Sequence, residues 1–338
     1  MEHVNVPIHS TMNALILDQF KQPFRLSEVT RPIPGDGEVL VRVRASGVNP
    51  LDTKIRAGAA AHAKHPLPGI LGIDLAGVVE QVGPGVTAFK RGDEVFGMTG
   101  GVGGNQGSLA QFAAVDARLL APKPANLSMR EAAALPLVFI TAWEGLVDRA
   151  KVSAGQKVLV QGGAGGVGHV AIQIAKAFGA EVYATDAAAK KPLIERLGAV
   201  AIDYREKTVE QYVAEYTDGL GFDVVYDTGG GAVLDASFAS VKRFGHVVSS
   251  LGWASHALAP LSFKAATYSG VFTLLPLLTG IGREHHGEIM REATRLAEAG
   301  ELVPIVDPRL FTLETASDAY AVIEDGNAQG KLVVDIDV

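Results

Sequence analysis

One glycine-rich segment carries the clearest chemistry in the chain, and it reads Gly162-Gly163-Ala164-Gly165-Gly166-Val167-Gly168. Within it, Gly163, Gly165 and Gly168 have the spacing G-x-G-x-x-G. Such glycines let a turn close tightly, let an anionic group approach the backbone, and let a helix pack closely on a strand. An apolar run at 158–160 precedes the segment and an amphipathic run at 167–178 follows it. The pattern therefore predicts a phosphate-binding turn between a strand and a helix.

A carboxylate, Asp186, follows the glycine-rich segment at the spacing typical of dinucleotide-binding turns. Asp186 ends the next predicted strand, about 20 residues after the middle glycine. There it would accept hydrogen bonds from ribose hydroxyls and repel a 2′-phosphate, so we expect a nicotinamide dinucleotide with a lean to NADH. Lys190, Tyr204 and Arg205 favour NADPH instead, because together they could bind that phosphate. Use of either cofactor therefore stays open.

The elements around this turn predict an α/β domain over residues 139–273. Strands and helices alternate there, and the strands are nearly continuous in apolar residues, as in a parallel sheet covered on both faces. The expected strands are 158–160, 181–185, 222–226 and 246–251, and the expected helices are 167–178 and 190–197.

The first third of the chain has a different sequence pattern. Short runs of alternating polarity, separated by Gly and Pro turns, predict a barrel-like β domain over residues 12–138. Its expected strands include 13–17, 39–43, 75–82 and 93–97, and a capping box, Ser128 with Glu131, predicts a helix start. Residues 274–338 return to this domain with a helix at 288–299 and a strand at 331–334. Residues 1–11 are expected to be a flexible N-terminal extension.

Composition excludes several classes of protein. The 338 residues contain no cysteine, which removes disulfides, thiolate catalysis and cysteine-ligated metals. The net charge of −7 argues against a nucleic-acid partner. No apolar stretch approaches the roughly 20 residues of a membrane span, and no signal-peptide pattern is visible, so we expect a cytoplasmic enzyme. The motifs H-E-x-x-H, G-x-S-x-G and G-x-x-x-x-G-K-[ST] are also absent.

Several segments together resemble a known family. The chain from Met12 onward is similar to the zinc-free quinone oxidoreductases, the zeta-crystallin-like branch of the medium-chain dehydrogenase/reductase superfamily. The matching segments are 46–56, 72–79, 92–97, 107–112, 162–168, 202–206 and 330–334.

The resemblance implies a fold and a reaction. A Rossmann doubly wound parallel sheet would be joined to a GroES-like β-barrel domain, with the active site in the cleft between them. The implied reaction is NAD(P)H-dependent reduction of quinones or α,β-unsaturated carbonyls without a metal. In the zinc alcohol dehydrogenases of the same superfamily, the positions of Asn49 and Ile73 hold a cysteine and a histidine ligand, and neither residue here can bind zinc well.

Hydride addition leaves negative charge on a carbonyl oxygen, and that charge needs hydrogen-bond donors. Asn49 and Lys54 are the candidate donors, although relatives often carry a tyrosine at the latter position. Thr141 resembles the family residue near the nicotinamide. The resemblance also implies that Leu251, Gly252 and the stretch Val271-Phe272-Thr273 frame the nicotinamide.

Assembly and two rival functions complete the expectations. The resemblance implies a homodimer formed by edge-to-edge pairing of Rossmann sheets, with 271–275 supplying the edge strand. One rival is an alcohol dehydrogenase-like enzyme acting on alcohols or aldehydes. The other is a non-catalytic nucleotide-binding protein, since a fold does not fix a function.

Overall fold

The computed structural model describes residues 10–336, and the chain forms two compact units. The first contains residues up to 137, then 274–294 and the chain from 304 onward; the second contains 138–273 and 295–303. The segment 295–303, expected in the first domain, therefore groups with the second. Of the expected extension, residues 1–9 lie outside the described residues, and Thr11 already begins a strand.

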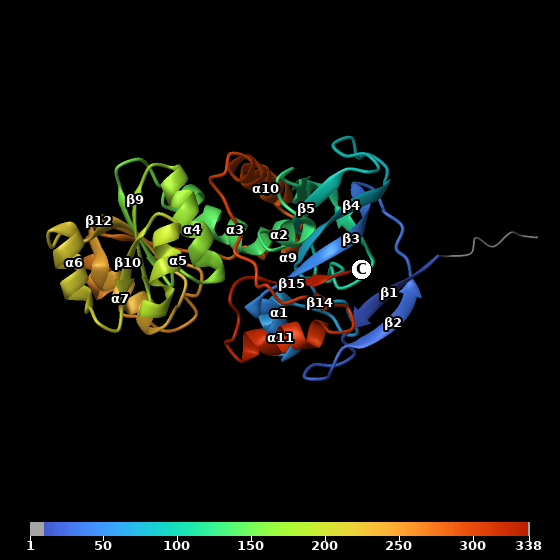
Figure 1. Ribbon diagram of the computed structural model, residues 1–338, viewed down its shortest axis with the longest axis horizontal. Helices are drawn as coiled ribbons and strands as arrows, with labels where there is room; N and C mark the ends of the chain where they lie inside the picture. The colour runs from blue at the N-terminus through green and yellow to red at the C-terminus, as the bar shows by residue number, and fades with distance from the viewer. Residues whose placement is uncertain (1–9, 337–338) are drawn as a thin grey trace, which may run out of the picture. The chain divides into compact units, whose positions relative to one another are not determined.

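The second unit is built on a six-stranded sheet in which every neighbouring pair is parallel. The strand order is β10-β9-β8-β11-β12-β13, which is the doubly wound order of the Rossmann fold. This confirms the predicted fold class. Figure 1 labels β9, β10 and β12 of this sheet together with the helices packed on it. The strands are β8 (Lys157–Gln161), β9 (Glu181–Asp186), β10 (Val200–Asp203), β11 (Phe222–Asp227), β12 (Val241–Ser249) and β13 (Thr267–Gly270).

Helices cover both faces of this sheet. The strands are apolar and buried along most of their length, so the side chains on each face pack against helices. On one face Leu159, Phe222 and Val225 pack in a core with residues of α6 (Val209–Thr217) and α7 (Ala232–Ser240). The other face is covered by α4 (Gly166–Ala177) and α5 (Lys191–Arg196). A short helix, α8 (Ala259–Ser262), lies between β12 and β13.

The edge of the sheet differs from the prediction. The apolar stretch 271–275 was expected to supply the edge strand, but the edge strand is β13, Thr267–Gly270. Val271 and Leu274 are instead buried in the turn that follows it, and Leu275 begins α9 (Leu275–Thr279). Apolar character alone could not separate a buried turn from a buried strand.

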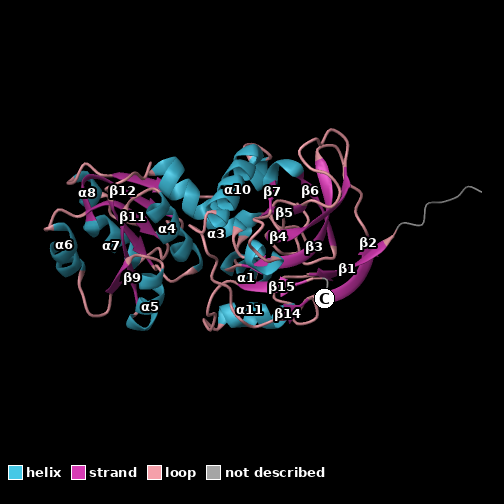
Figure 2. Cartoon of the chain, turned by 45° about the horizontal axis from the view of Figure 1, so that its top comes forward, coloured by secondary structure: helices cyan, strands magenta, loops and turns pink. Residues whose placement is uncertain are grey.

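The first unit contains a seven-stranded sheet and a separate two-stranded ribbon, β1 with β2 (Figure 2). The path of the sheet is β14-β15-β3-β4-β5-β7, and β6 also pairs with β3. The strands are β1 (Thr11–Ile16), β2 (Arg25–Thr30), β3 (Glu38–Val48), β4 (Asp74–Val82), β5 (Glu94–Met98), β6 (Phe112–Asp116), β7 (Leu120–Pro122), β14 (Phe311–Thr312) and β15 (Leu332–Asp335).

Two helices of this unit begin at a capping box. Helix α1 (Pro50–Arg56) follows β3 directly, with Asn49 as its N-cap and a proline in its first turn. Helix α2 (Met129–Ala133) begins at the predicted capping box, which the structure confirms. Helices α10 (Arg283–Glu298) and α11 (Ala316–Glu324) complete the set, the former beginning five residues before the expected start.

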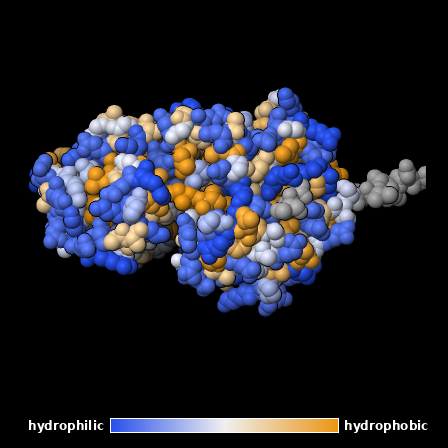
Figure 3. All heavy atoms as spheres, in the orientation of Figure 1, coloured by the Kyte–Doolittle hydropathy of each residue, from blue (hydrophilic) through white to orange (hydrophobic). Residues whose placement is uncertain are grey.

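Helix α3 (Pro136–Trp143) begins in the first unit and continues into the second. Its first residue is a proline, which suits the first turn of a helix because that position has no intrahelical partner for an N–H. Among residues 10–336, no helix has the length and apolar character to cross a bilayer, and hydrophilic side chains cover much of the face in Figure 3.

Candidate functional site

The glycine-rich loop joins β8 to α4, and two of its glycines are required by the packing. A Cβ added to Gly168 would lie 2.0 Å from the carbonyl oxygen of Gly162, and one added to Gly163 would lie 2.5 Å from Ala184 Cβ. Gly165 is different, because its nearest neighbour would be Gly162 oxygen at 3.2 Å. It is the N-cap of α4, so the surface above it is bare backbone at the positive end of a helix. The loop therefore fits a dinucleotide pyrophosphate.

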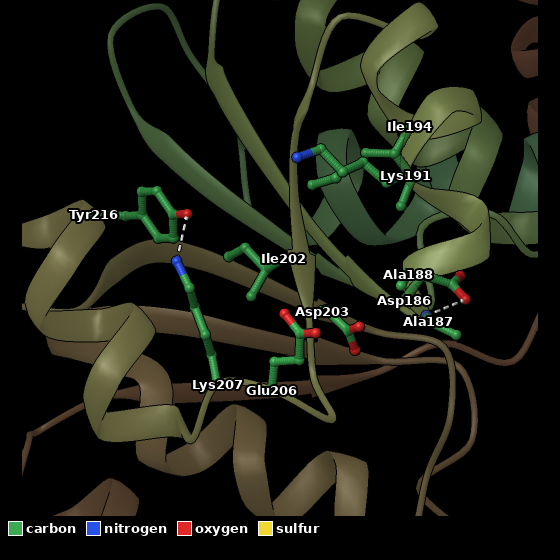
Figure 4. Close-up of a pocket in the computed structure, with 11 residues that line it drawn as sticks. Asp186, Ala187, Ala188, Lys191, Ile194, Ile202, Asp203, Glu206, Lys207 and Tyr216 are labelled. Atoms are coloured by element: carbon green, nitrogen blue, oxygen red, sulfur yellow. Dashed lines mark hydrogen bonds between the residues drawn. The ribbon is translucent and has the colours of Figure 1, made fainter.

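Asp186, at the carboxyl end of β9, is engaged with the backbone. One of its carboxylate oxygens accepts a hydrogen bond from the Ala164 N–H at 3.0 Å. The other accepts from the Ala187 N–H at 2.9 Å, and Figure 4 shows this second bond. The carboxylate thus braces the glycine-rich loop as well as facing the position expected for the ribose. Sequence reasoning predicted only the second role.

A pocket of about 180 Å³ lies beside Asp186. Its charged lining includes Lys191 and Lys207 as well as three carboxylates, and Lys207 Nζ lies 3.1 Å from the Tyr216 hydroxyl (Figure 4). Lys190 and Tyr204, which we expected to bind the cofactor, are exposed and do not line this pocket. Arg205 lies 5.6 Å from the centre of the Tyr204 ring.

The residues expected around the nicotinamide follow neighbouring strands of the same sheet. Leu251 and Gly252 come after β12. The backbone N–H of Leu251 donates a hydrogen bond to Ser249 Oγ at 3.0 Å. Ser249 in turn donates to Asp227, at the end of β11, at 2.7 Å.

Three more of these residues, Val271, Phe272 and Thr273, follow β13. The backbone N–H of Val271 donates to the carbonyl oxygen of Ser249 at 2.9 Å. The ring of Phe272 contacts that of Trp253 edge-on, with ring centres 5.9 Å apart. The structure therefore gathers the predicted cofactor residues at the carboxyl edge of the parallel strands, which is where open α/β sheets bind ligands.

Thr141 lies on α3 and is buried, with 7% of its surface exposed. Its carbonyl oxygen accepts a hydrogen bond from the hydroxyl of Tyr226 at 2.6 Å. Tyr226 belongs to β11 and is fully buried, so this contact fixes α3 on the sheet of the second unit.

Asn49 has a structural environment that the sequence did not reveal. Its side chain is fully buried, and Nδ2 donates to Asp74 Oδ2 at 2.9 Å. Its Oδ1 accepts a hydrogen bond from the Lys331 ammonium group. An ammonium group only donates and a carboxylate only accepts, so the amide has one possible orientation between them. Both Nδ2 and Oδ1 of Asn49 are thus hydrogen-bonded to other side chains of the protein.

Further polar contacts surround this amide. The Asn49 N–H donates to Asp52 Oδ2 at 2.9 Å, and Lys331 Nζ lies 3.2 Å from the carbonyl oxygen of Val48. Burial raises the pKa of Asp52 to about 7, helped by the charge of Asp74. Burial also raises the pKa of Asp74 to about 6 and lowers that of Lys331.

Lys54 lies on the exposed side of α1, whose buried residues include Asp52, Thr53 and Ile55. The structure does not bring Lys54 into the polar cluster with Asn49. Sequence reasoning missed Asp52, Asp74 and Lys331, although each lies inside a segment that carried the resemblance. For Asp74 and Lys331 the signal was a charge beside apolar residues, as in Ile73-Asp74-Leu75 and Lys331-Leu332-Val333. Asp52 has no such signal, because Thr53 and Lys54 follow it.

Zinc does not fit the residues at the positions compared with the zinc enzymes. Asn49 is held by Asp74 and Lys331, and the buried side chain of Ile73 offers no donor atom. Within the described part of the chain, no three His, Asp or Glu side chains are grouped so as to hold a metal ion.

Family models match both parts of the chain. Residues 35–125 match the alcohol dehydrogenase GroES-like domain, and residues 197–334 match the zinc-binding dehydrogenase family. The chain is also 38% identical over 316 residues to 2-methylene-furan-3-one reductase of Solanum lycopersicum, covering 91% of the chain and 74% of the relative. It is 37% identical, with the same coverage, to a chloroplastic NADPH-dependent alkenal/one oxidoreductase of Arabidopsis thaliana.

Solved structures agree with these relatives. An alcohol dehydrogenase superfamily protein from Novosphingobium aromaticivorans superposes with a TM-score of 0.95 at 59% identity, covering 97% of this chain and 100% of that one. A quinone oxidoreductase from Coxiella burnetii gives a TM-score of 0.82 at 29% identity, covering 97% and 100%. The chain is therefore a nicotinamide-dependent oxidoreductase, and it belongs to the zinc-free quinone oxidoreductase branch of the medium-chain dehydrogenase/reductase superfamily.

Proposed function

We propose that this enzyme reduces the carbon–carbon double bond of α,β-unsaturated carbonyls, and reduces quinones, at the expense of NADH or NADPH. The observation that carries the proposal is Asn49 between Asp74 and Lys331, at the position where the zinc enzymes have a metal ligand. Two relatives that are 38% and 37% identical to this chain over the 316 aligned residues are named 2-methylene-furan-3-one reductase and NADPH-dependent alkenal/one oxidoreductase.

The type of acceptor follows from the donors that are available. A bound nicotinamide supplies the hydride. Without a Lewis acid an isolated ketone is poorly polarised, because amide and ammonium donors stabilise an alkoxide less than zinc does. A conjugated acceptor spreads the arriving charge over an enolate or hydroquinone, so weaker donors suffice. Simple alcohols and aldehydes are therefore disfavoured as substrates.

The chain's own residues have distinct tasks in this proposal. Gly165 and the first turn of α4 bind the pyrophosphate, and Asp186 holds the loop while facing the ribose. Leu251, Gly252 and residues 271–273 enclose the nicotinamide at the carboxyl edge of the sheet. Thr141 stays a proposed neighbour of the nicotinamide, and Lys54 a proposed donor to the substrate oxygen.

Cofactor choice rests on opposing charges. The Asp186 carboxylate favours the ribose hydroxyls of NADH, whereas Lys190, Lys191 and Arg205 offer cations to the 2′-phosphate of NADPH. One curated relative is named NADPH-dependent, which does not favour the lean to NADH. We therefore propose that both cofactors are used and that Asp186 sets their ratio.

The sheet of the second unit has an open edge that bears on assembly. The outer edge of β13 has no neighbouring strand in the described sheet, and an open edge of this kind favours pairing with a second copy. We propose a homodimer formed there, and a cytoplasmic location stays a prediction. Light scattering at micromolar concentration should give about twice the 35.3 kDa of one chain. A mass of one chain would contradict the dimer.

A steady-state comparison of three acceptors tests the proposed function. The purified protein is assayed for NADH and NADPH oxidation with an enone, a quinone and the saturated ketone that matches the enone. We expect kcat/KM for the enone or the quinone to exceed that for the ketone by at least about a hundredfold, or about 3 kcal/mol. Turnover of the saturated ketone at a comparable rate would contradict the proposal.

A further inference from the structure

The polar cluster of the first unit joins segments that are far apart in sequence. It consists of Asn49, Asp52, Asp74 and Lys331, and each of them is at least nine-tenths buried. They come from the N-cap and first turn of α1, the start of β4 and the residue before β15. Two carboxylates and one ammonium group are therefore enclosed together, which is costly unless each group has a defined partner.

The cluster also holds the start of a second helix. Asp74 Oδ1 accepts a hydrogen bond from the backbone N–H of Leu137 at 2.8 Å, in the first turn of α3. The N–H groups of a first turn have no partner within their helix, and a carboxylate there is favoured by the helix dipole. Asp74 thus fixes α3 with one oxygen and Asn49 with the other.

The two helices fixed in this way carry the two residues proposed to face the reaction. Lys54 lies on α1, which the cluster holds through Asn49 and Asp52. Thr141 lies on α3, five residues after the proline that begins it. An error of about 1 Å in the position of a reacting group costs roughly a hundredfold in rate, so the starts of these helices need a rigid support.

We propose that Lys331 is a positioning residue for the reaction. Its ammonium group neutralises Asp74 across the Asn49 amide, and this relay holds the first turns of α1 and α3 in register with each other. Asparagine is the side chain for this place, because it accepts from an ammonium group and donates to a carboxylate at once. The proposal rests on the proposed function and adds a residue that acts without touching the substrate.

Substitutions of the lysine test this role against a merely structural one. Lys331→Met removes the charge and keeps most of the apolar stem, and Lys331→Gln keeps a donor without the charge. The matched control is Lys123→Met. Lys123 lies in the same unit, its side chain is 5% exposed, and it donates to the carbonyl oxygens of Pro124 and Leu127, outside the cluster.

The first readout is turnover of the best enone or quinone by folded protein. We expect kcat to fall at least tenfold in Lys331→Met and at least threefold in Lys331→Gln, with KM for the cofactor within twofold of wild type. Lys123→Met should keep kcat within twofold. A double-mutant cycle combines Lys331→Met with Asp74→Asn. The kcat of the double variant should be at most threefold below that of the poorer single variant, because each single change leaves one buried charge unpaired. Unchanged kcat in Lys331→Gln, or fully additive losses, would overturn the proposal.

The second readout is amide hydrogen exchange, which needs no activity. Peptides covering 50–56 and 136–143 should exchange at least tenfold faster in Lys331→Gln than in wild type, and should not change in Lys123→Met. Equal exchange in wild type and Lys331→Gln would overturn the positioning role. If wild-type enzyme reduces no enone or quinone, the proposed function fails by itself, while the exchange result still decides whether Lys331 holds the two helices.

Discussion

The glycine-rich loop of the second unit and the buried polar cluster of the first unit are constructed over different distances along the chain. The loop is a run of seven consecutive residues, braced by one carboxylate 22 positions beyond Ala164. The cluster joins side chains 25 and 282 positions apart. The loop offers bare backbone as its binding surface, so its signature is a pattern of glycines. The cluster works through side-chain partners, and no local pattern reports those.

Substitutions in the loop should have the largest effect and should separate packing from ligand binding. In Gly168→Ala the new Cβ meets the Gly162 carbonyl, and we expect cofactor affinity to fall by about a hundredfold, or about 3 kcal/mol, together with the unfolding temperature. In Gly165→Ala the affinity should fall while the unfolding temperature drops much less, because the new Cβ would lie 3.2 Å from the Gly162 oxygen, where a small shift can accommodate it. Calorimetric titration and thermal unfolding measure the two. Equal behaviour of both variants would contradict the distinction.

Asn49→Ala should be the most damaging single change in the cluster. It removes the hydrogen-bond partner of Asp74 Oδ2 and one of the two acceptors of the Lys331 ammonium group inside a buried cluster, so we expect the free energy of unfolding to fall by about 3 kcal/mol. The turnover number should fall more than KM rises, because the positions of α1 and α3 matter most in the transition state. Urea unfolding and steady-state kinetics check both. An unchanged turnover number would remove Asn49 from the catalytic machinery.

Asp186 allows a test in which the loop and its carboxylate are changed separately. Asp186→Ser should raise the ratio of NADPH to NADH efficiency by about tenfold, since it removes the negative charge facing a 2′-phosphate. Asp186→Asn, which keeps the shape of the side chain, should raise it similarly. A wild-type enzyme that already prefers NADPH by a hundredfold would mean that the carboxylate only braces the loop.

The cluster should also make stability depend on pH in an unusual direction. The carboxyl group of Asp52 keeps its proton in the folded state up to about pH 7, whereas its ordinary pKa is 3.8. Because the unfolded chain releases that proton first, the folded state should lose stability as pH rises from about 4 to about 7. Asp52→Asn should weaken this loss, as measured by urea unfolding at both ends of the range. A steeper loss in the variant would contradict the assignment.

Metal removal is the change for which we expect no effect. The residues at the compared ligand positions, Asn49 and Ile73, cannot hold zinc. Exhaustive chelation should therefore leave kcat unchanged, and elemental analysis should find no stoichiometric zinc. One zinc per chain, with activity lost on its removal, would contradict the metal-free mechanism.

The parts of the fold that were predictable are those coded by neighbouring residues. The capping box of Ser128 and Glu131, the helix after Gly165 and the strand ending at Asp186 all appear where their patterns place them. Elements decided by tertiary contacts were harder. The stretch 271–275 has the composition of a strand, but Thr267–Gly270 is the segment that pairs with β12. Val271 and Leu274 are buried in the turn that follows.

The candidate site divides in the same way. The common location of the proposed cofactor residues was predictable because parallel strands bring their carboxyl ends to one edge, so the order of motifs along the chain fixes their neighbourhood. Lys331 was not, because its partner Asn49 is at the opposite end of the sequence and pairs with it only after β15 joins β3. Single charged residues in apolar runs were the available hint, and they do not name their partners.

Transfer of a label tests the central claim most directly. The protein is incubated with an enone and NADPH or NADH deuterated at the transferable position of the nicotinamide, and the product is examined by NMR. Conjugate reduction predicts a saturated ketone with one deuterium on the carbon β to the carbonyl. Deuterium on the carbonyl carbon of an allylic alcohol would instead show carbonyl reduction, and would contradict the account.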